Sequence, residues 1–146
     1  MKKEILITVI DGQGGGIGKA YIQSLVKSLP KDRKPIIRAL GTNSAAADHM
    51  RKGGATDSAA GENAIIHNVK KADIIVGVTA IVIADSILGE ISPAIARAVG
   101  SSDAYRILIP FDSCNTRIAM AGTATLQELI DRAVVLTLQR MDELAE

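Results

Sequence analysis

ILITVIDGQGGGIG, residues 5–18, is the stretch that decides the fold of this 146-residue chain. Its first half is a nearly continuous apolar run rich in β-branched residues, which is typical of a strand covered on both faces, as in a parallel sheet. Glycines follow at positions 12, 14, 15, 16 and 18, and apolar residues then recur at helical spacing from Ile17 to Leu29. The stretch therefore predicts a buried strand, a glycine-rich turn and a helix that begins near Gly16.

The glycine-rich turn has the properties of an anion-binding site. Glycine adopts positive φ angles and lets a ligand approach the backbone closely. The N-terminus of the following helix offers unpaired N–H groups and the positive end of its dipole. The alternative is a turn that binds nothing, but five glycines cost folding entropy that a plain turn would not need. We expect the turn to hold the phosphates of a nucleotide or dinucleotide, at Gly12, Gln13, Gly14, Gly15, Gly16, Ile17 and Gly18.

The spacing of the glycines matches one known motif and fails two others. Gly12-x-x-x-Gly16-x-Gly18 resembles the cofactor turn of short-chain dehydrogenases, over about the first 30 residues. This resemblance implies NAD(P) or another nucleotide as the ligand. The pattern G-x-G-x-x-G fails because its third glycine would fall at Lys19, and the P-loop pattern fails because Ala20 follows Lys19.

The end of the predicted second strand, Ile36–Leu40, departs from the dehydrogenase pattern. Dinucleotide folds usually have an acid near this point that binds the ribose hydroxyls, and none stands here. Thr42, Asn43 and Ser44 are the groups that remain to bind a hydroxyl or a phosphate, including a 2′-phosphate. The alternative is that Asn43 or Ser44 only caps the helix that follows.

The catalytic half of a short-chain dehydrogenase is also missing, because neither Tyr21 nor Tyr105 has a lysine four positions later. Residues that follow strand ends offer another possibility. Asp11, Asp112 and Cys114 would meet at one edge of a parallel sheet, and a small enzyme with a site built from them is the alternative to a binding protein.

Asp11 has two possible roles of its own. With Asp85 and Asp112 it would form an acidic cluster, which beside a phosphate needs a shared Mg²⁺ or another partner. Alternatively, its carboxylate ties the turn together by hydrogen bonds to the backbone, and this is the role we favour.

The rest of the chain alternates between short apolar strands and helices, which indicates βαβ units. Residues 53–61 are small and polar and are predicted to form a loop. The predicted strands are residues 5–10, 36–40, 74–77, 106–111 and 117–120. The predicted helices are residues 16–29, 45–52, 62–71 and 93–99, and a final helix after the capping box at 125–128. We predict one domain, 1–146: a three-layer, Rossmann-like α/β fold with a mostly parallel open sheet of about five strands.

Val78–Gly89, VTAIVIADSILG, fits no single template. A buried loop with a short helical turn is one interpretation and an additional strand is the other, and periodicity does not decide between them. If the segment is exposed, it would form a contact between subunits. A non-catalytic oligomeric or regulatory protein is therefore a third functional hypothesis.

Composition narrows the class of protein. The net charge is +1 and aromatic residues are 2% of the chain, so neither a nucleic-acid surface nor a base-stacking platform is expected. A single cysteine and two histidines predict no disulfide and no metal site. The longest uncharged apolar stretch is too short to cross a membrane. We expect a cytoplasmic protein with a small-molecule nucleotide as its partner, and a homo-oligomer is one of the assemblies we consider.

Five segments carry a resemblance across nearly the entire chain. They are VIDGQGGGIGKA (9–20), ALGTNS (39–44), GENAI (61–65), ADIIVG (72–77) and LGEISPA (88–94). In these segments the chain resembles a family of small bacterial Rossmann-like proteins classed as a domain of unknown function. The resemblance implies the fold and no particular activity.

Overall fold

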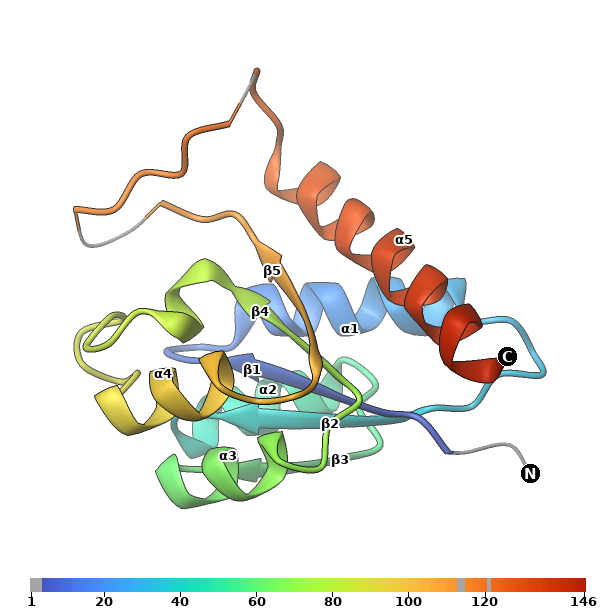
Figure 1. Ribbon diagram of the computed structural model, residues 1–146, viewed down its shortest axis with the longest axis horizontal. Helices are drawn as coiled ribbons and strands as arrows, with labels where there is room; N and C mark the ends of the chain where they lie inside the picture. The colour runs from blue at the N-terminus through green and yellow to red at the C-terminus, as the bar shows by residue number, and fades with distance from the viewer. Residues whose placement is uncertain (1–3, 113–114, 121) are drawn as a thin grey trace.

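A five-stranded sheet forms the centre of the computed structural model, which describes residues 4–112, 115–120 and 122–146 (Figure 1). The strands are β1 (Leu6–Asp11), β2 (Ile36–Gly41), β3 (Asp57–Ala60), β4 (Ile74–Val78) and β5 (Tyr105–Ile109). Their order is β3-β2-β1-β4-β5, and every neighbouring pair is parallel. The predicted α/β class and parallel open sheet are thereby confirmed.

Helices cover both faces of the sheet and make the fold three-layered. They are α1 (Gly16–Ser28), α2 (Ser44–Lys52), α3 (Glu62–Val69), α4 (Pro93–Gly100) and α5 (Leu126–Ala145). Helix α1 packs against α2 and α5, whereas α3 packs against α4 on the other side (Figure 1). Because both faces are covered, β1 and β4 are apolar almost throughout, and all five residues of β4 are buried.

The predicted helix starts are confirmed at two caps. The Ser92 hydroxyl accepts the Ile95 N–H and Pro93 is the first residue of α4. At α5, Thr125 and Glu128 form the capping box, each side chain accepting the other residue's N–H. These signals are local in sequence, which is why they could be recognised without tertiary information.

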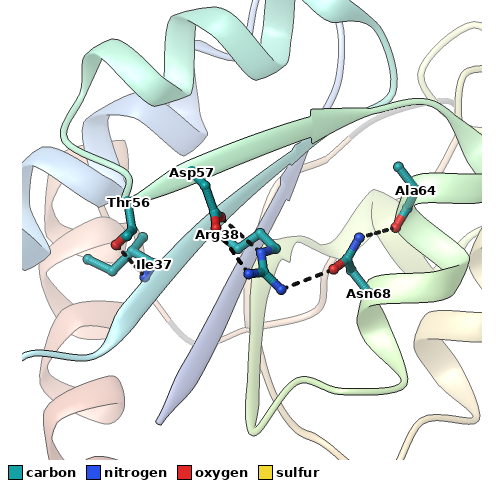
Figure 2. A network of polar contacts seen from close by, with 6 residues as sticks. All are labelled: Ile37, Arg38, Thr56, Asp57, Ala64 and Asn68. Atoms are coloured by element: carbon teal, nitrogen blue, oxygen red, sulfur yellow. Dashed lines mark hydrogen bonds and ion pairs between the residues drawn. The ribbon is translucent and has the colours of Figure 1, made fainter. Parts of the chain in front are cut away.

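One of the five strands was predicted in the wrong segment of the chain. Residues 53–61, predicted as a loop, contain the edge strand β3, whereas residues 117–120, predicted as a strand, do not join the sheet. Strand β3 has the sequence DSAA and no apolar run, so hydrophobic periodicity does not mark it as a strand. Figure 2 shows a side-chain contact that joins β3 to β2: Arg38 on β2 donates to both carboxylate oxygens of Asp57, at 2.9 and 3.0 Å, and to Asn68 of α3.

The segment Val78–Gly89 follows the first of the two interpretations. A short 3₁₀ helix, η1 (Thr79–Val82), leads into a loop over residues 83–91, here called the 83–91 loop. Asp85, Ile87 and Leu88 adopt positive φ angles in this loop, which neither a strand nor a helix would contain. The first part of the segment is buried at Val78, Ala80 and Ile81, whereas the loop that follows is partly exposed, and Leu88, 88% exposed, is its most exposed large apolar side chain.

Candidate functional site

The ends of β1, β4 and β5 open onto a cavity of about 460 Å³. After β1 the chain continues to β2 on one side, and after β4 it continues to β5 on the other side. The cavity therefore lies at the topological switch point, where ligands bind in open α/β folds. The lining residues are Asp11, Gly12, Gln13, Gly14, Gly15, Gly16, Ile17, Val78, Ala80, Ile87, Leu88 and Phe111. Six of the seven turn residues predicted to bind a ligand are therefore here.

The buried carboxylate of Asp11 binds the backbone of the turn. Its two carboxylate oxygens accept the N–H groups of Gly12 and Gly18, each at 2.8 Å, so the acid links the first residue after β1 to the first turn of α1. Burial raises the pKa of Asp11, although both hydrogen bonds act in the opposite direction. The favoured prediction, that Asp11 ties the turn together, is confirmed.

Three further N–H groups of the turn have no acceptor among the described residues. The Gly15 N–H donates to the Gly12 carbonyl and the Gln13 N–H donates to Glu90, at 2.9 Å in both cases. The N–H groups of Gly14, Gly16 and Ile17 are left, and all three residues line the cavity. These amides and the adjacent end of the α1 dipole are the part of the turn that can receive an anion.

The glycines of the turn fall into two groups by the space around them. A Cβ added to Gly12 would lie 2.9 Å from Thr42 Oγ1, and one added to Gly15, which has φ +71°, would lie 2.6 Å from the Ala46 carbonyl oxygen. Gly14 and Gly16 have no positive φ, and a Cβ on either would meet nothing within 4 Å. Packing explains the first two glycines but not Gly14 and Gly16.

Glu90 is a site residue that the sequence did not reveal. One of its oxygens, Oε1, accepts the Gln13 N–H, the Thr42 hydroxyl and the Asn43 side-chain N–H. Burial alone would raise the pKa of Glu90, but the hydrogen bonds from Thr42, Gln13 and Asn43 outweigh it and hold the pKa below its ordinary value. A carboxylate thus stands beside the end of β2, supplied by the 83–91 loop rather than by β2.

Thr42, Asn43 and Ser44, the predicted ribose or phosphate ligands, do not line the cavity. Thr42 and Asn43 bind Glu90. The Asn43 side chain also accepts the Ala46 N–H and so caps α2, which begins at Ser44. Asn43 therefore acts as a helix cap, which was the alternative prediction for this segment.

His49 and Lys19 form a second feature that sequence reasoning missed. Lys19 Nζ lies 3.3 Å from His49 Nε2, and His49 Nδ1 lies 2.6 Å from the Gly14 carbonyl oxygen. Because an ammonium group can only donate, Nε2 accepts from Lys19 and the proton resides on Nδ1, which donates to Gly14. The pair joins α1 and α2 to the turn and brings a positive charge near it.

Two residues of the predicted enzyme site, Asp11 and Asp112, do not line the same cavity. Asp11 lines the cavity at β1, whereas Asp112 lines a different one, accepts the Ile118 N–H at 2.8 Å and pairs with Arg117. Asp85 is exposed on the 83–91 loop, and Cys114 lies outside the described residues. In residues 4–112, 115–120 and 122–146, no group of His, Cys, Asp and Glu side chains is arranged to hold a metal ion.

A comparison with known proteins identifies the family of this chain. None of the helices in the described part of the chain combines the length and apolar character needed to span a membrane. No curated protein matches the chain. A family model described as Domain of unknown function (DUF3842) matches residues 6–142, which include every strand and most of α5. The chain therefore belongs to this family of unknown function.

Proposed function

We propose that this protein binds a nucleotide, with a phosphate on the free amides of the β1–α1 turn. The observation that carries the proposal is the pair Gly14 and Gly16, which line the cavity although neither a positive φ nor a close neighbour requires glycine there. A ligand that approaches the backbone closely supplies the missing reason. The free N–H groups of Gly14, Gly16 and Ile17 support the same assignment.

We assign the base and sugar to the apolar part of the cavity. Val78, Ala80 and Ile87 line this part, and its volume lies within the range of small-molecule sites. Leu88 and Phe111 line it too, yet they are 88% and 42% exposed. A planar base placed against them would bury both, which would favour binding by removing apolar surface from water.

The experiment is a titration of the purified protein with AMP, ATP, NAD, NADP, flavin mononucleotide and S-adenosylmethionine, followed by melting temperature and calorimetry. We expect at least one phosphate-containing ligand to raise the melting temperature. The variant Leu88→Asn should weaken the binding of that ligand, because asparagine offers no apolar contact. Asparagine is chosen because it tolerates the φ of +53° at this position. Val135→Ala, which alters an exposed side chain on α5, is the matched control. No shift with any ligand would refute the proposal.

A further inference from the structure

Glu90 holds a negative charge next to the amides that we propose for phosphate binding. We propose that this carboxylate makes the site selective for a ligand with one phosphate, so that a nucleoside monophosphate binds and the corresponding triphosphate is rejected. The inference rests on the proposed function and names the ligand class for the same site.

The first argument is the number of donors that remain. Asp11 occupies the N–H groups of Gly12 and Gly18, and Glu90 occupies that of Gln13. The turn thus satisfies part of its anion-binding capacity with two carboxylates of the chain itself. The three N–H groups left over match the three terminal oxygens of a single phosphate and offer nothing to a second or third.

The second argument is charge. Glu90 Oε1 lies 2.9 Å from the Gln13 nitrogen, and Gly14 is the next residue. A phosphate oxygen bound to the Gly14 N–H would then lie no more than about 10 Å from that carboxylate oxygen. This upper limit is comparable with the screening length of about 8 Å in physiological salt, so salt reduces the repulsion without removing it. Repulsion therefore grows with each additional phosphate.

The third argument is that Glu90 is fixed in place. Donors from two turns converge on one oxygen: Gln13 after β1, and Thr42 and Asn43 after β2. Ile87, from the same loop, lies over the turn, since its Cγ2 atom would be 3.2 Å from a Cβ on Gly12. Further phosphates that extended toward Glu90 or along the apolar walls of the cavity would find no stabilising group there.

The experiment measures the dissociation constants of adenosine, AMP and ATP by calorimetry in EDTA, for the wild-type protein and for Glu90→Gln. We expect AMP to bind the wild-type protein at least tenfold more tightly than ATP, and the preference to fall below threefold in Glu90→Gln. Asp85→Asn is the matched control, because it removes an exposed carboxylate from the same loop at a φ of +64° that asparagine accepts. Its preference should equal that of the wild type.

The possible failures are distinguishable. If ATP binds the wild-type protein as tightly as AMP, or if the two variants change the preference equally, the role of Glu90 is refuted while the nucleotide site stands. If adenosine binds as tightly as AMP, or if no compound binds, the proposed function fails and this inference fails with it. Should Glu90→Gln not fold, raising salt from about 50 to about 500 mM must narrow the wild-type preference by screening, and an unchanged preference would refute the inference.

Discussion

Gly16→Ala is the substitution that separates stability from binding most sharply. Gly16 is the first residue of α1, it has no positive φ, and a Cβ there would meet nothing within 4 Å. Alanine at a compatible position stabilises a protein by about 0.4–1 kcal/mol, because the unfolded chain has less freedom to lose. For a domain of this size that gain corresponds to a rise in melting temperature of roughly 1–4 °C.

The added methyl group should also weaken the binding of the ligand. Gly16 lines the cavity, so the Cβ would occupy space beside the free amides that we assign to the phosphate. Losing one hydrogen bond to a charged group costs about 1.5–3 kcal/mol, which corresponds to a roughly 10- to 150-fold weaker dissociation constant. We therefore expect a more stable protein with poorer binding.

Two matched variants control this experiment. Gly100→Ala lies at the end of α4, also in open space and without a positive φ, so it should add stability and leave binding unchanged. Gly15→Ala should lower stability by about 2 kcal/mol or more, since its φ is +71° and the Cβ would lie 2.6 Å from the Ala46 carbonyl oxygen. Melting temperature and calorimetry measure both effects. Unchanged ligand affinity in Gly16→Ala would refute the phosphate assignment, and a loss of stability would refute the reasoning about its surroundings.

Two further predictions concern the edge strand and the pH dependence. Arg38→Lys loses the bidentate pair with Asp57, whose side chains are 25% and 44% exposed, so we expect a loss of about 1 kcal/mol and faster amide exchange in β3. Asp48→Asn, which breaks the exposed pair with Lys52, should cost less, and an equal loss would contradict the role of Arg38. The pKa of Glu90 in the folded protein lies below its ordinary value of 4.5. The stability that Glu90 contributes is therefore present above about pH 4.5 and is lost as the pH falls through the lower, folded pKa. Urea unfolding should show that the difference in the free energy of unfolding between the wild type and Glu90→Gln shrinks from pH 7 to pH 3. A difference that stays constant over this range would contradict the contribution assigned to the Glu90 carboxylate.

Sequence reasoning succeeded where the signal was local. The apolar run of β1, the glycine turn and the caps at Ser92 and Thr125 depend on neighbours a few positions apart. The role of Asp11 was also within reach, since its partners Gly12 and Gly18 are one and seven residues away. In each case the chemistry of the segment is enough to specify the structure.

The failures have a common physical cause in distant partners. Strand β3 has no apolar run, and a pair between Arg38 and Asp57, 19 residues apart, helps to hold it on β2. Glu90 contacts Gln13 across 77 residues, from a loop whose positive φ angles follow no periodic pattern. A sequence pattern of period two or 3.6 contains no information about such contacts.

The 83–91 loop links the shape of the cavity to its charge. Ile87 and Leu88, with φ of +55° and +53°, form one wall, and a non-glycine residue in this region costs about 1–3 kcal/mol. Contacts on both sides offset that cost: Ser86 Oγ lies 2.6 and 2.7 Å from the carbonyl oxygens of Ala80 and Ile83 and shares its one hydrogen between them, and Glu90 binds the two neighbouring turns. Glu90 therefore sets the charge beside the turn and also holds the wall in position. For this reason Glu90→Gln, which retains an accepting oxygen, tests the charge, whereas Glu90→Ala would release the wall as well.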